Sequence, residues 1–291
     1  MNFWLLLFNF TYSNLHFHLF NGNFYLYAIF ILLSFLLFII WPFHCFYFTL
    51  RTAILKTFWN NFFPFGLNGV KFRDYMFGEL LTSLTRPFNS LTFTVCLVIC
   101  SNCLEKNQNG KCQRNDLPGF LVNLIPFIIR FFQSINRYYY TRMAWPNLAN
   151  VLRSSLGIFF VIMNWLFFET NKTLIILIGV IYTFYILFLE IKVDWNLGYF
   201  KVKYFFLREK LLYPVFFYYV ALVVNFILRF TWLYNFYIPS DIIRDELKIF
   251  IFSILEIYRR TQWSLFRVEN ENQNNFEKYR TFLEIPELPV D

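Results

Sequence analysis

The sequence predicts an all-α polytopic membrane protein with about eight transmembrane helices. Of its 291 residues, 58% are hydrophobic and only 15% are charged, whereas soluble domains carry about 25% charged residues. The first formal charge is Arg51, so the first 50 residues contain no Asp, Glu, Lys or Arg. Because a transmembrane helix needs roughly 20 largely apolar residues, this stretch alone is long enough for a pair of helices.

Low-charge segments of sufficient length recur along the whole chain. They lie near 2–20, 24–42, 75–101, 118–137, 147–168, 172–191, 211–235 and 245–266. The segment 43–62 is aromatic but carries Arg51 and Lys56, which is typical of an amphipathic helix at the membrane interface. We therefore expect residues 1–74 to form N-terminal transmembrane helices and this interfacial helix, and residues 75–291 to form a core.

The distribution of basic residues predicts the orientation. With both termini in the cytosol, the inside loops hold 12 Lys and Arg residues and the outside loops hold 5, as the positive-inside rule requires. The net charge of +8 is spread between apolar runs rather than along one stripe. We therefore expect the lipid bilayer, and not nucleic acid, to be the partner of this chain.

Five cysteines cluster in the first part of the chain, and their spacing allows more than one chemistry. Cys112 could form a disulfide with Cys103 or Cys100 across a polar stretch that this orientation places outside the cytosol. A zinc site is the alternative, but the set lacks the usual paired spacing. The sequence predicts no metal and no cofactor.

Arginines inside apolar runs are the most informative feature. Arg130, Arg153, Arg229, Arg259 and Arg260 all occur in or beside predicted spans. A charge at bilayer depth costs roughly 2.5–3.5 kcal/mol, so burial of even a few of them would cost about 10 kcal/mol. Any one of them could instead extend to the membrane surface from a helix end. It could also form an ion pair with a carboxylate one helical turn away, as Arg260 could with Glu256.

Carboxylates on other helices can offset only part of this charge. The candidates are Glu79, Glu190, Asp194 and Glu256, so the basic side chains remain in excess. Arginine suits a tetrahedral oxyanion because its planar fork donates two parallel hydrogen bonds and stays charged. The pattern indicates a phosphate or sulfate site in a pore.

Four ordered motifs resemble the EXS family. They are SINRYYYTRMAWPNLANVLRSS (134–155), FLEIKVDWN (188–196), LREKLLYPVFFYYVALVVNFILRFTW (207–232) and ILEIYRRTQWSLFRVENENQNNFEKYR (254–280). The resemblance covers roughly 118–289, with a weaker extension through VKFRDYMFGELLTSL (70–84). The family includes phosphate exporters of animals and plants and a Golgi retention protein of fungi.

The resemblance implies export of inorganic phosphate between the C-terminal helices, and it suggests a homodimer. Carried over by position, the phosphate-contacting and gating candidates are Arg137, Arg153, Arg229, Trp232, Arg259, Arg260, Glu256, Asp194, Glu190, Glu79 and Thr82. Several of them depart from the family pattern. Arg153 stands where Lys is common, Glu79 and Glu190 stand where Asp is expected, and Thr82 stands where Asn is usual.

The chain begins directly in an apolar run, so we expect it to lack the SPX domain of the plasma-membrane exporters. The fungal Golgi retention protein resembles it in this respect. This similarity implies phosphate transport from the Golgi lumen to the cytosol, with the Golgi or another endomembrane as the location and the plasma membrane as the alternative.

Two other functions compete with transport. A non-transporting scaffold for retention or sorting of Golgi and ER proteins could use the basic loop 192–210 and the polar tail 267–291 as its docking surface. A membrane enzyme is disfavoured, because the three His residues lie far from the arginines in sequence and none of the common hydrolase, zinc-protease or P-loop motifs is present.

Overall fold

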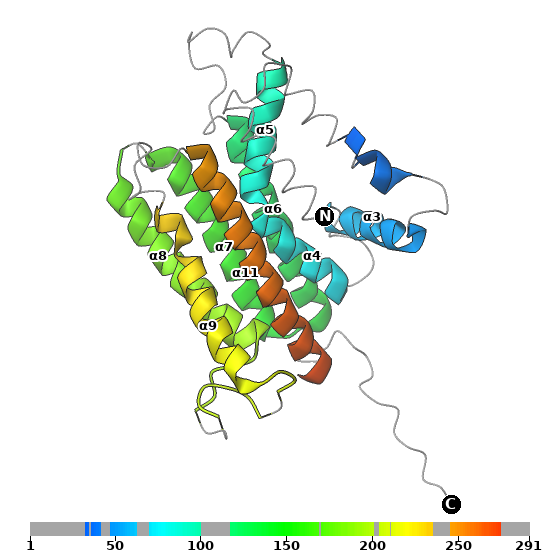
Figure 1. Ribbon diagram of the computed structural model, residues 1–291, viewed down its shortest axis with the longest axis vertical. Helices are drawn as coiled ribbons and strands as arrows, with labels where there is room; N and C mark the ends of the chain where they lie inside the picture. Colours follow the sequence, from blue (N-terminus) through cyan, green and yellow to red (C-terminus); the bar gives the residue numbers. More distant parts are fainter. Residues whose placement is uncertain are drawn as a thin grey trace, which may run out of the picture.

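The computed structural model describes residues 33–34, 36–41, 47–62, 70–99, 117–168, 170–200, 204–209, 211–234 and 245–274. All regular elements within these ranges are helices. The long helices lie side by side in one bundle (Figure 1), and α11 (Asp245–Asn274) packs between α9 (Val215–Arg229) and α4 (Phe72–Ser83). The all-α class predicted from the sequence is confirmed.

Among the described residues, four helical segments are long and apolar enough to cross a membrane. They are α6 (Leu117–Thr141), α7 (Ala144–Phe167), α8 (Lys172–Leu189) with the π-helical turn η1 (Glu190–Asp194), and α9 with the 3₁₀ turn η2 (Thr231–Leu233). Asn171 caps α8 by accepting a hydrogen bond from the backbone N–H of Leu174. These segments coincide with four of the apolar runs predicted to span.

The predicted segment 75–101 is two helices rather than one. Helix α4 ends at Ser83, and α5 (Thr85–Ile99) begins after a break at Leu84. Pro87 supplies the physical reason, because it has no N–H to donate to the carbonyl of Ser83 and its ring crowds that carbonyl. The broken pair still runs along the bundle as one interrupted rod (Figure 1).

The structure describes the remaining predicted segments to different extents. The interfacial segment 43–62 contains α3 (Phe48–Phe62), whose Arg51 is buried and donates to the carbonyl oxygens of Phe38 and Trp41. The segment 2–20 lies outside the described residues, and 24–42 is described only in part. Helix α11 continues two turns past its predicted end at 266. The count of about eight transmembrane helices therefore stays a prediction.

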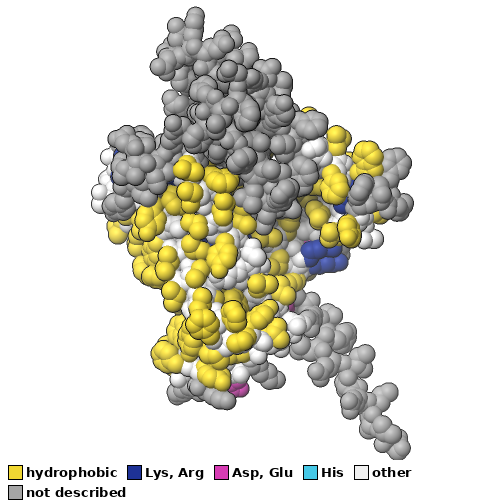
Figure 2. Space-filling model, in the orientation of Figure 1, with side chains coloured by type: hydrophobic (Ala, Val, Ile, Leu, Met, Phe, Trp, Pro, Cys, Tyr) yellow, Lys and Arg dark blue, Asp and Glu magenta, His cyan; other side chains and the backbone are white. Residues whose placement is uncertain are grey.

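The outer surface of the bundle is apolar. Along α8, Leu177, Ile181, Phe184 and Phe188 are each more than 50% exposed and recur at three- and four-residue intervals. Figure 2 shows hydrophobic side chains spread over the visible face of the bundle. Charged side chains such as Arg259 are instead fully buried. This inversion of the soluble pattern identifies an integral membrane protein.

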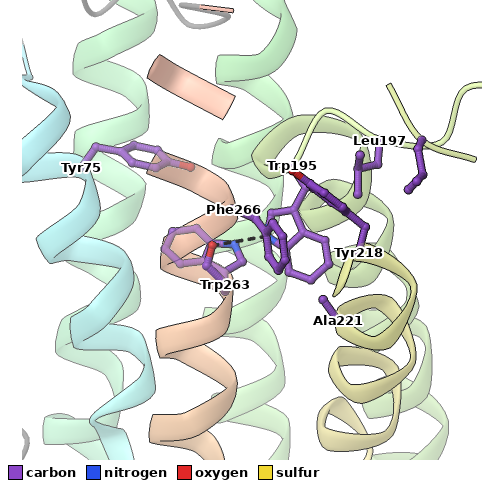
Figure 3. Packing of buried hydrophobic residues seen from close by; sticks show 8 residues of the cluster. Tyr75, Trp195, Leu197, Tyr218, Ala221, Trp263 and Phe266 are labelled. Atoms are coloured by element: carbon purple, nitrogen blue, oxygen red, sulfur yellow. Dashed lines mark hydrogen bonds between the residues drawn. The ribbon is translucent and has the colours of Figure 1, made fainter. Parts of the chain in front are cut away.

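An aromatic core closes the end of the bundle where α9 begins and α11 ends. Trp195, Tyr218, Trp263 and Phe266 are buried against one another there (Figure 3). The indole N–H of Trp195 donates to the carbonyl oxygen of Trp263 at 3.3 Å. The segment after η1 is thereby attached to α11.

A buried polar cluster lies beside this core, within the region expected to be a polar tail. Glu269 forms an ion pair with Arg208 at 2.5 Å and accepts hydrogen bonds from the hydroxyl of Tyr218 and the N–H of Leu212, the latter at 2.9 Å. The Asn270 amide donates to the carbonyl oxygens of Val193 and Asp194. The expectation of an exposed tail from residue 267 is therefore wrong as far as residue 274, where α11 ends.

Candidate functional site

One face of α11 supplies the side chains around which the site is built. Lys248, Phe252, Glu256 and Arg260 recur every four residues and line the same pair of connected cavities. Side chains at this spacing share one helix face. The sequence period of α11 therefore places alternating charges along the interior of the bundle rather than toward lipid.

Glu79 of α4 is shared by three arginines from three other helices. Arg130 of α6 binds its Oε1 at 2.5 Å, and Arg153 of α7 binds the same oxygen at 3.1 Å. Arg260 of α11 reaches Oε2 at 3.4 Å. All four side chains are at least 90% buried. Three guanidinium groups around one carboxylate leave local positive charge in excess.

Asp194, at the end of η1, is the second shared carboxylate. Its Oδ2 accepts from Arg153 at 3.0 Å and from the indole N–H of Trp263 at 3.1 Å. Its Oδ1 accepts from the hydroxyl of Tyr75 at 3.2 Å, and Arg267 lies 3.9 Å away. Asp194 is completely buried, so these partners replace water around its charge.

Glu190, one helical turn before Asp194, binds the end of α9. Arg229 forms an ion pair with its Oε1, and Asn225 donates to its Oε2 at 2.9 Å. Arg259 of α11 also reaches Oε1, at 3.1 Å. The π-helical turn carries both carboxylates on the interior side, which matches the tendency of such turns to occur at functional sites.

The adjacent arginines of α11 have different partners. Arg259 forms a paired contact with Glu256, at 2.9 and 2.6 Å. Arg260 instead crosses to the end of α4, where it donates to Ser83 at 2.6 Å and to Thr82 at 3.4 Å. The pairing of Glu256 with Arg260 that the sequence allowed is therefore replaced by a pair three residues apart.

A cavity of about 120 Å³ lies among these side chains. It is lined by four arginines and two carboxylates. The charged lining residues are Arg130, Arg153, Arg229, Arg260, Glu79 and Glu256. Thr82 and Ser154 add hydroxyl groups to the same wall. The cavity is next to Glu79 and the arginines that bind it. Asp194 and Glu190 do not line it, but they bind Arg153 and Arg229, which do.

A larger cavity of about 660 Å³ adjoins the first and extends toward the end of the bundle where α11 begins. The residues common to both linings form a neck. The neck residues are Thr82, Phe127, Tyr182, Ile186, Arg229 and Glu256. The larger cavity adds Arg86 and Lys248. Together the two cavities are lined by six Arg and Lys side chains and two carboxylates.

Two glycines allow aromatic side chains to approach the cavities. A Cβ on Gly157 would lie 2.5 Å from the ring of Phe127 and 2.7 Å from the hydroxyl of Tyr182. A Cβ on Gly179 would lie 2.5 Å from the ring of Trp232. Trp232 lines the larger cavity and donates its indole N–H to Thr183 at 3.1 Å.

Not every predicted site residue joins this cluster. Arg137 is buried on α6, two turns beyond Arg130, and it lines neither cavity. Cys103 and Cys112 lie outside the described residues. Cys96, on α5, is disulfide-bonded. The disulfide predicted between Cys103 and Cys112 therefore stays a prediction.

Several residues of the site carried no clear signal in the sequence. Tyr75 and Trp263 hold Asp194, and Asn225 holds Glu190, yet aromatic and amide residues are common in membrane helices. Lys248 lies near the start of the predicted segment 245–266, where a cation usually snorkels. Arg86 lies inside the predicted segment 75–101, and its charge there was not singled out. Helix packing, and not spacing, brings them to the cavity.

Comparisons with known proteins agree with the motifs. The model of the EXS family matches residues 1–273, a longer stretch than the motifs alone covered. Solute carrier family 53 member 1 of Cricetulus griseus is 30% identical over 287 residues, which cover 87% of this chain and 40% of the relative.

Two further relatives come from a plant and a slime mould. Phosphate transporter PHO1 homolog 4 of Arabidopsis thaliana is 31% identical over 278 residues, covering 90% of this chain and 36% of the relative. SPX and EXS domain-containing protein 4 of Dictyostelium discoideum is 30% identical over 231 residues, which cover 75% of this chain and 21% of the relative. The chain thus spans 40% or less of the length of these relatives. Because the family model covers most of the sequence, the chain belongs to the EXS family.

Proposed function

We propose that this chain moves inorganic phosphate across a membrane through the two connected cavities of the helix bundle. The observation that carries the proposal is the excess of cations among the described residues around them: six Arg and Lys side chains line the cavities, against two lining carboxylates and the two others, Asp194 and Glu190, that pair with Arg153 and Arg229. A buried excess of this kind is costly unless an anion offsets it. The similarity to a phosphate transporter of Arabidopsis thaliana supports phosphate as that anion.

Arg229 and Arg260 are the residues best suited to bind phosphate in passage. Arg229 lines both cavities and its side chain is 16% exposed, the most among the ion-paired arginines of the cluster. Arg260 holds Glu79 only at 3.4 Å. An incoming phosphate would take over these donors from Glu190 and Glu79. Because the carboxylates compete for the same arginines, phosphate can also leave again.

The remaining candidates serve as support in this proposal. Arg259 holds Glu190 and Glu256 in place, and Asp194 holds Arg153. Thr82 adds a hydroxyl to the neck, and Trp232 forms part of the wider wall. Arg137 would act outside the two cavities. We assign no cofactor to the process, and we propose the homodimer only on the family resemblance.

The direction of transport follows from the orientation predicted by charge. The basic loop after η1 would lie in the cytosol, so the larger cavity would extend toward the opposite side. The disulfide at Cys96 supports an oxidising compartment near that end of α5. We therefore propose transport from the lumen of the Golgi or another endomembrane to the cytosol, with the plasma membrane as the alternative location.

The scaffold function has lost part of its basis. Arg208, Arg267, Glu269 and Glu271, which were to form a docking surface, are all buried. Side chains engaged inside the bundle are not available to bind the tails of other proteins. These positions therefore do not support a docking surface on this part of the chain.

The experiment that tests the proposal is phosphate flux through purified protein in liposomes. Vesicles loaded with radiolabelled phosphate should lose it faster with the protein than without, at equal vesicle size. Labelled sulfate and chloride serve as comparison anions. If protein-containing and empty vesicles lose phosphate at the same rate, the proposal is wrong, and a scaffold assayed by capture of Golgi enzyme tails becomes the better explanation.

A further inference from the structure

The larger cavity adds cations of its own to those of the inner cluster. Arg86, in the first turn of α5, and Lys248, in the first turn of α11, both line it. Neither residue lines the smaller cavity around Glu79. The cavity of about 660 Å³ is far larger than the inner one, so it has room for an anion of its own.

Packing between α5 and α11 brings these cations to a common face. The guanidinium of Arg86 stacks over the ring of Phe252 at 5.2 Å. Phe252 follows Lys248 by one helical turn, so both residues share one side of α11. Lys248 is 6% exposed, which places its charge inside the cavity wall rather than in open solvent.

The break in the α4–α5 rod creates the position of Arg86. Because α5 starts anew at Thr85, its first two turns, with Arg86 and Asn89, line the cavity. Interrupted helices in transporters commonly present such ends to an anionic substrate. The helix dipole at a new N-terminus adds to the positive potential.

Neutral hydrogen-bond donors complete the wall. Asn89 comes from α5, Asn123 from α6 and Asn164 from α7, and all three line the same cavity. An amide donates two hydrogen bonds and carries no charge, so it can orient an oxyanion without holding it irreversibly. Glu256, at the neck, is the one described carboxylate in this lining, and both its oxygens accept from Arg259.

We propose that Arg86 and Lys248, with the asparagine amides around them, form a second oxyanion site in the larger cavity, separate from the inner cluster and occupied by phosphate before it passes the neck. This inference rests on the proposed function, since it takes inorganic phosphate as the ligand. A charged cavity raises the local concentration of a counter-ion by about 10-fold or more. The site would supply phosphate to the inner cluster when the phosphate concentration outside the cavity is low.

The test measures phosphate binding and flux in the double variant Arg86→Gln/Lys248→Gln. Equilibrium binding of radiolabelled phosphate to purified protein should fall from two sites to one. In liposomes the KM for phosphate should rise by about 10-fold, more than the maximal rate falls. Lys172→Gln is the matched control, because Lys172 is exposed at the start of α8 and lines neither cavity.

The outcomes separate this inference from the proposed function. If the wild type transports phosphate but the double variant keeps both binding sites and its KM, the second site does not exist. If Lys172→Gln raises KM equally, general surface charge is responsible, and the inference is again wrong. If the wild type binds two phosphates but moves none, the transport proposal fails while the second site stands. Arg86→Lys, which keeps the charge, should restore binding if the double variant folds poorly.

Discussion

Arg153 of α7 and Asp194 of η1 form a buried ion pair, with 3.0 Å between Nη2 and Oδ2. The other terminal nitrogen of Arg153 binds Glu79 of α4 at 3.1 Å. One guanidinium thus joins three segments that lie far apart in the sequence. The fork of arginine makes this possible, because its terminal nitrogens point to separate acceptors in one plane. This geometry gives a physical reason for Arg rather than Lys at this position.

Replacing Arg153 tests this bridge. Arg153→Ala leaves Asp194 and Glu79 each short of a partner, and removing one member of a buried ion pair costs about 3–5 kcal/mol. Arg153→Lys keeps the charge but cannot span both carboxylates, so it should be intermediate. Thermal unfolding of the purified variants in detergent checks the order. Equal melting temperatures for wild type and Arg153→Ala would show that the bridge contributes no stability.

Gly157 packs against two residues that line the neck. Gly157→Ala would push a methyl group against Phe127 and Tyr182, which line both cavities. The rings can yield only toward the neck or out of their packing, so phosphate flux should fall at least several-fold. Ser155→Ala on the same helix is the control, because its hydroxyl donates to the carbonyl of Val151 in that helix and Ser155 lines neither cavity. Gly157→Ala combined with Phe127→Leu should recover flux, and failure to recover would contradict a steric neck.

Trp232 is held in the wall of the larger cavity by its hydrogen bond to Thr183. A typical hydrogen bond of this kind contributes about 0.5–1.5 kcal/mol. Thr183→Val and Trp232→Phe should each lower flux, and the double variant should be no worse than Trp232→Phe alone, because both changes remove the same bond. Flux of the four proteins at one phosphate concentration completes the cycle. Strictly additive losses would mean that the bond does not couple these positions.

The pair of Arg208 and Glu269 should matter for stability rather than for substrate affinity. It lies outside both cavities. Glu269→Ala leaves Arg208 buried without its carboxylate and should cost about 3–5 kcal/mol, whereas Arg208→Met/Glu269→Leu should cost less because no charge is left unpaired. Unfolding measurements compare the variants. A change in the KM for phosphate without a loss of stability would place the pair on the path instead.

The sequence predicted the transmembrane helices best where composition alone decides. Segments α6 to α9 are long apolar runs, and length is the main requirement for crossing a bilayer. The sequence did not predict the break at Leu84, although Pro87 lies three residues after it. Membrane helices tolerate proline when neighbouring groups satisfy the carbonyl that loses its hydrogen bond, so a proline alone does not mark a helix end. The end of α11 was missed for a related reason. A run of polar residues after 266 is typical of a tail, but contacts with η1, Arg208 and Tyr218 bury it.

The site could be predicted as a set of residues but not as a set of contacts. Arg153, Arg229 and Arg260 were identifiable because charge inside an apolar run needs an offset. Their partners depend on how helices lie against one another, so the crossing of Arg260 to Thr82 had no counterpart in sequence spacing. The same holds for Arg86, which reaches the cavity only because α5 begins anew at Thr85.

The measurement that tests the transport path most directly compares phosphate efflux from liposomes with wild type, Arg229→Ala and Arg142→Gln. Arg229 lines both cavities, and its loss still leaves Glu190 paired with Arg259 and Asn225, so the fold should survive. Arg142, which stacks on Tyr139, lines neither cavity. At equal incorporation, wild type and Arg142→Gln should release phosphate and Arg229→Ala should not. Efflux by Arg229→Ala at the wild-type rate would contradict an arginine-lined path.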